Sequence, residues 1–338
     1  MEVTLEDKIL LAHGSGGKLA HDLVEKSFVK TFANPLLAKM DDSAVFELGG
    51  RLAFTTDSYV VSPIFFPGGD IGKLAVCGTV NDLAMSGAKP LYLSLSFIIE
   101  EGLARSELNR IIDSTQKAAE EGGVKIITGD TKVVDQGSAD KLFVNSAGIG
   151  IVPEGVDISG SNARPGDKVI ISGSIGDHGI AVVSQREGLS FSTQLESDCA
   201  PLASLVAEML GVSPDIHCLR DPTRGGLATT LNELAKQSGV SIRIEEEKLP
   251  IREEVQAACE MLGFDPLYVA NEGKLVAIVS AKDADRVLQA MKGNRYGRNA
   301  TIIGEVAAEH PGRVAMKTSL GSSRIVDMLV GDLLPRIC

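Results

Sequence analysis

Five aspartates stand at the ends of apolar segments or beside glycine, where a carboxylate can face a ligand. They are Asp42 in KMDDSAV, Asp57 in FTTDSY, Asp82 in TVNDLA, Asp130 in ITGDTK and Asp221 in LRDPTRGGL. Mg²⁺ takes oxygen ligands and leaves room for substrate phosphates, so these residue types suit a magnesium site. Each one alone is as consistent with a solvated turn or a helix cap. Asp41 precedes Asp42, and neighbours on a strand point to opposite faces, so only one of the two is expected to reach a metal.

Three glycine clusters supply backbone that can approach a phosphate closely. They are HGSGGK (13–18), SGSIGDHGI (172–180) and DPTRGGL (221–227), each followed by a helix-like segment. Free backbone N–H groups at such positions can surround phosphate oxygens. None of the clusters has P-loop spacing, and no G-x-G-x-x-G opens a Rossmann unit, so neither standard nucleotide-binding fold is predicted. An ordinary glycine-rich turn is an equally good interpretation of each cluster alone.

The five cysteines are odd in number, widely spaced and without a C-x-x-C pair, which argues against a disulfide framework or a structural zinc site. Four of them have apolar neighbours and are interpreted as small buried hydrophobes, namely Cys77, Cys199, Cys218 and Cys259. Cys338 is the last residue of the sequence, at a position where chains are usually exposed and mobile. Arg336 can favour its thiolate by offsetting the C-terminal carboxylate. The sequence therefore indicates a mobile, reactive thiol.

Composition is that of a folded protein with two domains of ordinary size. The chain has 338 residues, of which 44% are apolar, and a net charge of −12. That charge argues against a nucleic-acid surface, which needs clustered Lys and Arg. No apolar run is long enough to cross a bilayer, and the acidic start MEVTLEDKILL differs from a basic secretory signal. We expect a cytoplasmic protein without membrane contact.

Alternating strands and helices must position the residues that carry the chemistry. In the first half, strands are predicted over 51–61, 91–99, 124–130 and 141–152, and helices over 71–86 and 106–121. In the second half, a strand, a glycine-rich turn and a helix over 163–188 precede helices over 200–210, 224–238, 251–262 and 283–292 and strands over 240–246 and 274–280. The pattern restarts at 153–165, where Pro, Gly and Ser concentrate.

This pattern predicts an α/β (α+β) fold of two domains, each a mixed sheet covered by helices. The predicted divisions are residues 1–155, residues 156–310 and a tail over 311–338 that carries Cys338. The tail has an apolar stripe that is interpreted as core packing or, alternatively, as a reversible latch, comprising Ile325, Met328, Leu329, Leu333 and Leu334.

Taken in order, the motifs resemble the PurM superfamily of ATP-dependent enzymes, to which AIR synthetase belongs. They are HGSGGK, KMDDSAV, FTTDSY, GTVNDLAMSGAKP, ITGDTK, ISGSIGDHGIAV, DPTRGGL and NEGKL, and they extend over nearly the whole chain. The opening HGSGGK and the ending PRIC resemble the HypE family of hydrogenase maturation factors within that superfamily. The resemblance implies a two-domain PurM-like fold whose N-terminal domain dimerises through its sheet, with Mg²⁺ and ATP held between domains near the dimer interface.

The resemblance also implies a set of site residues. Mg²⁺ would be held by Asp42, Asp57, Asp82, Asp130 and Asp221. ATP would be bound by Gly14, Ser15, Gly16, Gly17, Lys18, Asp130, Thr131, Arg224, Gly225 and Gly226.

The chemistry implied by the resemblance involves the C-terminal cysteine. HypE-like proteins are described as receiving a carbamoyl group there from the carbamoyltransferase HypF. They dehydrate it with ATP to a thiocyanate, and the cyanide passes to iron in a HypC–HypD complex. Cys338 would be the carrier, and Glu272 in VANEGKL is the candidate base because burial can raise its pKa, although a solvated turn glutamate is an equal interpretation. Lys132 is the candidate that neutralises the transferred phosphate, although an exposed surface lysine is an equal interpretation. His178 is a weaker candidate, because a histidine near a helix start is often a cap or a core contact.

Two other functions are compatible with the same motifs. One is another PurM-like activation, of the selenophosphate synthetase or AIR synthetase type. Selenophosphate synthetases usually carry a reactive Cys or selenocysteine in the first glycine-rich segment, and LLAHGSGGK has none. The other is an ATP-sensing scaffold that docks maturation partners through its tail and performs no chemistry.

Overall fold

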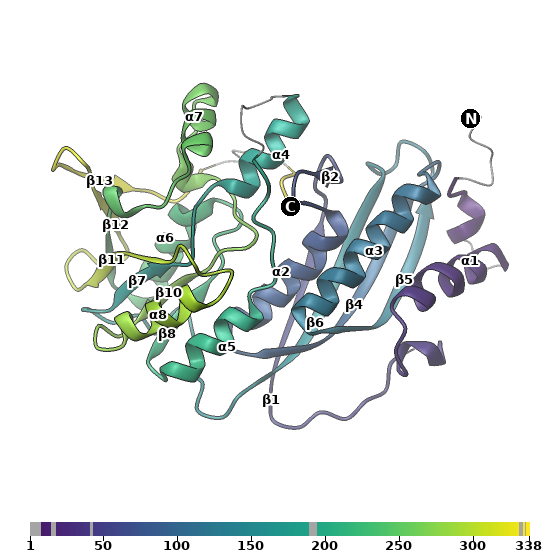
Figure 1. Ribbon diagram of the computed structural model, residues 1–338, viewed down its shortest axis with the longest axis horizontal. Coiled ribbons are helices and arrows are strands. Elements are labelled where there is room, and N and C mark those ends of the chain that lie inside the picture. The colour runs from purple at the N-terminus through teal and green to yellow at the C-terminus, as the bar shows by residue number, and fades with distance from the viewer. Residues whose placement is uncertain (1–7, 15–17, 41–42, 189–194, 331–333, 335) are drawn as a thin grey trace.

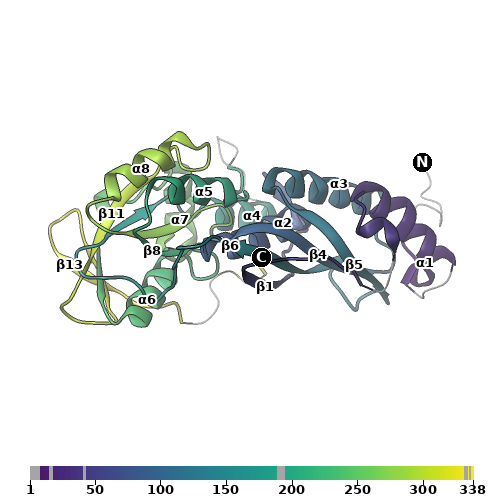
Figure 2. The same cartoon turned by 90° about the horizontal axis from the view of Figure 1, so that it is seen from below.

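The computed structural model describes residues 8–14, 18–40, 43–188, 195–330, 334 and 336–338. These residues form two α/β domains that lie side by side (Figures 1 and 2). The first domain's sheet ends with β6 (Leu142–Val152) and the second domain's sheet begins with β7 (Lys168–Ile171). The predicted linker at 153–165 lies between them.

The first domain is built on a four-stranded mixed sheet with the order β1-β6-β4-β5. Its other strands are β1 (Arg51–Tyr59), β4 (Lys89–Glu100) and β5 (Lys125–Val134). β6 runs antiparallel to both β1 and β4, whereas β4 and β5 are parallel. The parallel pair requires a crossover, which α3 (Arg105–Gly122) supplies. A two-residue hairpin, β2 (Phe65–Phe66) and β3 (Gly69–Asp70), precedes α2 (Ile71–Met85), and α1 (Lys18–Leu23) lies beyond β5 (Figure 1).

Helix α2 is the central element of the first domain. It begins where the Asp70 carboxylate accepts hydrogen bonds from the backbone amides of Gly72 and Lys73, which satisfies two N–H groups that a helix start leaves unpaired. Nearly all of its residues are buried, because it packs against the sheet, against α3 and against α5 of the second domain. Any polar residue on this helix therefore faces a packed interior or a site.

The second domain is built on a seven-stranded mixed sheet with the order β13-β12-β9-β11-β7-β10-β8. The remaining strands are β8 (Ile216–Arg220), β9 (Ser241–Glu245), β10 (Val276–Val279), β11 (Thr301–Ala307), β12 (Val314–Lys317) and β13 (Ser323–Val326). The helices are α4 (Asp177–Glu187), α5 (Ala203–Val212), α6 (Gly226–Ser238), α7 (Glu253–Leu262) and α8 (Ala284–Gly293). Only β12 and β9 pair in parallel among these strands.

Helices cover both faces of the second sheet because its central strands are apolar on both sides. Val169 and Ile171 of β7 join the core under α6, whereas Ile170 between them joins the core under α5 and α8. This alternation follows from the two-residue repeat of a strand. The predicted fold class, two mixed sheets covered by helices, is confirmed.

The predicted tail begins too early. Residues 314–317 and 323–326 add strands β12 and β13 to the second sheet, so the tail starts only after Val326. Val314, Met316 and Val326 are buried in the core under α6. The two strands are four residues long, and a two-residue repeat over so short a run is hard to separate from loop sequence.

The interpretation of the tail's apolar stripe as core packing is correct only in part. Ile325 lies in a strand and is 51% exposed, and Met328 is 40% exposed. Leu334 does pack against the core, and Leu333 lies outside the described residues. Among the residues described, none of the helices is both long and apolar enough to span a membrane.

Candidate active site

A cavity of about 470 Å³ lies between the two domains. Its walls come from segments far apart in the sequence: strand β1, helix α2, the loop from β8 to α6, the turn at Glu272 and the end of the tail. The predicted residues that line it are Asp57, Asp82, Asp221, Arg224, Glu272 and Cys338. The structure therefore gathers three of the five predicted metal ligands, the candidate base and the candidate carrier thiol in one place.

Three carboxylates enter the cavity from three different elements. Asp57 Oδ2 accepts a hydrogen bond from the Tyr59 hydroxyl at 3.0 Å, and Asp82 Oδ2 accepts one from Thr55 Oγ1 at 2.7 Å. Burial raises the pKa of Asp57, and burial with the nearby Asp57 charge raises the pKa of Asp82. Burial, reinforced by the Asp82 charge, raises the pKa of Asp221 to about 7. Three desolvated carboxylates that repel one another form an environment that a cation would stabilise.

Strand alternation and one glycine bring Asp57 and Asp82 to the same cavity. Asp57 and Tyr59 are two residues apart on β1 and so share a face of the sheet. The Tyr59 ring reaches helix α2 at Gly78, where a Cβ atom would lie 2.2 Å from the tyrosine hydroxyl. Gly78 is thus required for this packing, which places the carboxylate of Asp57 beside the helix that carries Asp82.

Glu272 is buried, with 3% of its surface exposed. Its backbone N–H donates to Asp198 Oδ1 at 3.1 Å, and its carbonyl accepts from Asn81 Nδ2 at 3.3 Å. Burial raises the pKa of Glu272 well above its ordinary value, and the charges of Asp221 and Asp198 reinforce the shift. The Glu272 carboxylate is therefore a stronger base than a solvated glutamate.

The tail is docked inward, with Cys338 at the cavity. The Val60 N–H donates to the Cys338 main-chain oxygen at 3.1 Å, and the Ser62 N–H donates to the Arg336 carbonyl at 3.1 Å. The last residues thus pair with the segment that follows β1. Ile337 between them is 4% exposed and belongs to the first domain's core.

Two arginines connect the tail to both domains through hydrogen bonds and an ion pair. Arg186 Nη2, from α4, donates to the Arg336 carbonyl at 2.8 Å and also bonds the Ser62 carbonyl. Arg336 Nε donates to the Val60 carbonyl at 3.1 Å, and its guanidinium forms an ion pair with Asp140. The role expected of Arg336, to offset the terminal carboxylate, is therefore accompanied by specific structural contacts.

Within one chain, the remaining predicted residues lie elsewhere. Asp130, Thr131 and Lys132 are on β5, at the opposite sheet edge from β1, and line a separate cavity beside the α1 region. Asp130 and Lys132 form an ion pair at 3.1 Å with both side chains more than half exposed. Lys18 begins α1, and Gly14 ends the preceding helical turn. Ser15, Gly16, Gly17 and Asp42 lie outside the described residues, as does Asp41.

Two of the glycine-rich loops have different relations to the cavity. Gly225 and Gly226 have φ angles of +77° and +60°, and a Cβ at Gly226 would lie 2.5 Å from the Leu267 carbonyl oxygen. They form the sharp turn that presents Arg224 to the cavity and starts α6. The cluster around Gly173 lines a smaller cavity of about 150 Å³ on the other side of the Glu272 turn.

Sequence reasoning missed several residues of the cavity. Tyr59 carried a usable signal, because it lies two residues after Asp57 on a predicted strand. Arg220 and Glu233 both line the cavity and form an ion pair at 2.6 Å. Asn81, next to Asp82, bonds the Glu272 carbonyl from the other domain, and no sequence pattern indicated that contact.

Comparisons with known proteins identify the family that has this two-domain fold. Two family models match the chain: AIR synthase related protein, N-terminal domain, over residues 40–152, and AIR synthase related protein, C-terminal domain, over residues 164–317. Carbamoyl dehydratase HypE of Azotobacter vinelandii is 54% identical over 329 residues, which is 97% of this chain and 96% of that protein.

Solved structures give the same result. A crystal structure of hydrogenase maturation protein HypE in complex with ATP superposes with a TM-score of 0.95 at 50% identity, covering 97% of this chain and 99% of that one. A chain from a crystal structure of a HypE–HypF complex superposes with a TM-score of 0.81 at 52% identity, covering 91% of this chain and 99% of that one. With its two AIR synthase-related domains and full-length similarity to these proteins, the chain belongs to the HypE family of carbamoyl dehydratases, enzymes of hydrogenase maturation.

Proposed function

We propose that this chain uses ATP to dehydrate a carbamoyl group carried on its own Cys338, giving a thiocyanate whose cyanide is delivered to the iron of a [NiFe]-hydrogenase. The observation that carries the proposal is the meeting of Cys338 and Glu272 in one cavity with three carboxylates. A carrier thiol, a base and a cation-binding group are the three components that the reaction requires.

The proposed reaction balances as follows. The carboxamide oxygen attacks the γ-phosphorus of ATP, ADP leaves, and the nitrogen gives up one proton. The nitrogen then loses its second proton as the C–O bond breaks, so that phosphate departs and a C≡N bond forms on the sulfur. Carbamoyl thioester and ATP thus give thiocyanate, ADP, phosphate and a proton. Glu272 is the proposed acceptor of the nitrogen protons, because its pKa is raised and it faces the same cavity as Cys338.

The residues of the cavity fit a divalent cation. Burial raises the pKa values of Asp57, Asp82 and Asp221, with repulsion from neighbouring carboxylates adding to the shift at Asp82 and Asp221, and a bound cation would reverse these shifts. When bound, Mg²⁺ would supply positive charge against the phosphate oxygens of ATP. Arg224, whose side chain lines the same cavity, is proposed to add a fixed positive charge on the phosphate side.

We propose that a second copy of the chain supplies Asp130, Thr131 and Lys132. The face of the first sheet away from α2 and α3 exposes large apolar side chains, including Phe54 at 70% and Leu52 at 52%. If two such faces pack about a two-fold axis parallel to the strands, the β5 edge of one copy lies against the β1 edge of the other. That arrangement would bring Lys132 of one copy toward Asp57 of the other, together with His13, which lines the same cavity as Lys132.

The proposed partners follow from the carrier role of the tail. A similar protein is known in a HypE–HypF complex, which supports HypF as the source of the carbamoyl group. A HypC–HypD complex is the proposed acceptor of the cyanide. For both encounters the tail has to leave the docked position seen here, because Ile337 is buried and Cys338 lies at the interdomain cavity.

Mass spectrometry of the C-terminal peptide tests the proposal. After incubation with HypF and its carbamoyl donor, the peptide should gain a carbamoyl group on Cys338, and addition of ATP should then remove the mass of one water. The Cys338→Ser variant is the control and should show neither change. A carbamoylated peptide that keeps its water in the presence of Mg²⁺ and ATP would contradict the enzymatic function and favour a scaffold.

A further inference from the structure

A fully buried histidine recognises the tail. His178, in the first turn of α4, places Nε2 2.8 Å from the Ile337 carbonyl oxygen and Nδ1 2.8 Å from Ser197 Oγ. A carbonyl only accepts, so Nε2 carries the hydrogen, and in the neutral ring Nδ1 accepts from the Ser197 hydroxyl. Burial lowers the pKa of His178, which keeps the ring neutral. The Phe66 ring packs edge-on against it at 5.4 Å and fixes its plane.

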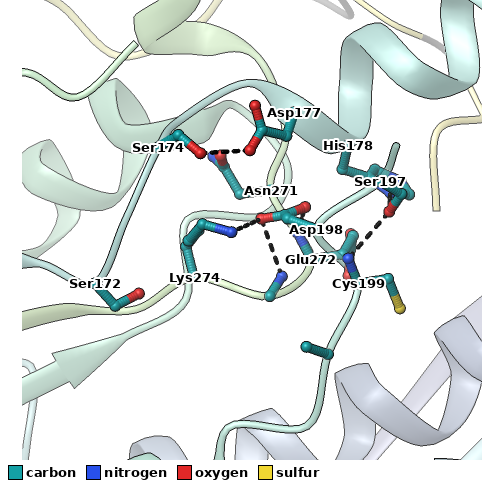
Figure 3. Close-up of polar contacts among 12 residues, drawn as sticks. Ser172, Ser174, Asp177, His178, Ser197, Asp198, Cys199, Asn271, Glu272 and Lys274 are labelled. Carbon is teal, nitrogen blue, oxygen red and sulfur yellow. Dashed lines mark hydrogen bonds and ion pairs between the residues drawn. The ribbon is translucent and has the colours of Figure 1, made fainter. Parts of the chain in front are cut away.

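Ser197, which His178 contacts, is the first of three consecutive residues, 197–199, that connect His178 to the turn carrying Glu272 through hydrogen bonds. Ser197 Oγ accepts from the Cys199 N–H at 3.1 Å, which fixes the backbone around Asp198. Asp198 then holds the turn that carries Glu272: its Oδ1 accepts from the Glu272 N–H at 3.1 Å, and its Oδ2 accepts from the Gly273 N–H at 3.3 Å. Figure 3 shows Asp198 between this turn and His178.

The Asp198 carboxylate is buried and charged. Its side chain is 3% exposed, and Lys274 Nζ donates to Oδ2 at 3.0 Å. Burial alone would raise the pKa of Asp198, but the Lys274 charge and the hydrogen bond from the Glu272 amide act against it, and the net shift is downward. Breaking these contacts would leave a buried charge without its partners, which costs free energy. Asp198 is therefore expected to stay bound to Lys274 and to the Glu272 turn.

Packing leaves no room for the segment and the turn to move independently. A Cβ atom on Gly273 would lie 1.8 Å from the Asp198 carbonyl oxygen, so these two backbones are in direct contact. On the other side, the Ser197 N–H donates to the Pro67 carbonyl of the first domain at 2.8 Å. A displacement of residues 197–198 is therefore transmitted to the backbone of Glu272.

We propose that His178, Ser197 and Asp198 are positioning residues that couple docking of the C-terminal tail to the placement of Glu272. With the tail docked, the Ile337 carbonyl completes the chain of bonds from His178 through residues 197–198 to the Glu272 turn. With the tail withdrawn, His178 Nε2 loses its buried acceptor. The hydrogen bonds from His178 through residues 197–198 then no longer hold the Glu272 turn in one position. The base is then in position only when the carrier cysteine is at the cavity. The catalytic meaning rests on the proposed function, whereas the coupling is a property of the fold.

Hydrogen exchange tests the coupling without any chemistry. A chain shortened by Ile337 and Cys338 should exchange the Glu272 and Gly273 amides about tenfold faster than the full chain, which is the effect of losing one buried hydrogen-bond partner. Cys338→Ser is the matched control, because it removes the thiol and keeps the Ile337 carbonyl, and its exchange should match the full chain. Strand β10 should stay protected in all three proteins, which shows that the fold is retained. Unchanged exchange at 272–273 in the shortened chain would overturn the proposal.

Substitutions at His178 test the same coupling by rate. His178→Ala should lower the single-turnover rate of dehydration by about 10²-fold with the KM for ATP unchanged, because a small displacement of a base is that costly. His178→Gln can donate to Ile337 and accept from Ser197, and should keep most of the rate. Equal losses in both variants, or none in either, would overturn the positioning role. If the unaltered chain forms no thiocyanate at all, the proposed function fails, while the hydrogen-exchange result still decides the coupling.

Discussion

Replacing Asp221 by asparagine should stabilise the magnesium-free protein, and the gain should grow with pH. Burial and the Asp82 charge raise the pKa of Asp221 in the folded protein to about 7 from its ordinary value of 3.8. Because the folded pKa is above the unfolded one, the unfolded chain ionises first, and stability is lost as pH rises through this interval. A difference of about three pKa units corresponds to about 4 kcal/mol in the free energy of unfolding. Asp221→Asn should recover up to that amount above about pH 7 and almost none below about pH 4.

Urea denaturation in the presence of a chelator measures this effect. The free energies of unfolding of the two proteins are compared at about pH 4, 6 and 8, with equal m-values required so that the difference reports stability. Addition of Mg²⁺ should narrow the difference, since a cation that binds only the folded state at a hundred times its Kd contributes about 2.7 kcal/mol, which offsets more than half of the roughly 4 kcal/mol. The unaltered chain should gain this stabilisation when Mg²⁺ is added, whereas the Asp221→Asn variant should gain only a small part of it.

The matched control is Asp113→Asn, on the exposed face of α3, which should change stability by less than about 0.5 kcal/mol at every pH. An Asp221→Asn variant that is no more stable than the unaltered chain at high pH without Mg²⁺ would refute the reasoning. So would a gain of the same size at pH 4 and pH 8, because a pH-independent effect would come from packing and not from the buried charge.

Three further outcomes are expected. Glu272→Gln should lower the dehydration rate by about 10²–10⁴-fold while calorimetry shows unchanged ATP affinity, since the amide keeps the shape and cannot accept the proton. Asp140→Asn removes the ion pair with Arg336, which is partly exposed and contributes less than about 1 kcal/mol to docking of the tail. Exchange of the Ser62 amide should therefore rise by at most about fivefold. Carbamoylation of Cys338 by HypF should become faster, because the tail is less firmly docked. An equimolar mixture of Lys132→Ala and Cys338→Ser chains should recover about a quarter of full activity if Lys132 acts across a two-fold dimer, and no activity if it acts within one chain.

Local sequence patterns identified most of the helices and strands but not β8 or β11, and it was the family resemblance that assigned Asp57, Asp82, Asp221, Glu272 and Cys338 to one site. Docking of the tail was beyond such patterns. The hydrogen bond between Val60 and Cys338 joins residues that only the folded chain brings together. The inward position thus depends on long-range contacts, as does the link from Asn81 to the Glu272 carbonyl. Strands β12 and β13 were not predicted because each is only four residues long, and so short a strand shows too little periodicity in the sequence.

The proposed function requires the tail to serve both a buried site and outside partners, and the energetics of the docked tail are consistent with this. Its hydrogen bonds to Val60, Ser62, His178 and Arg186 contribute about 1 kcal/mol each, and burial of Ile337 adds about 2 kcal/mol. Against this gain of about 6 kcal/mol, ordering the three terminal residues, 336–338, costs about 3–6 kcal/mol of backbone entropy in total, at about 1–2 kcal/mol each. The two totals are of similar size, so docking is close to balance. A partner that binds the extended tail with modest affinity can then withdraw it, and the contacts to His178 and Arg186 return it to the cavity after release.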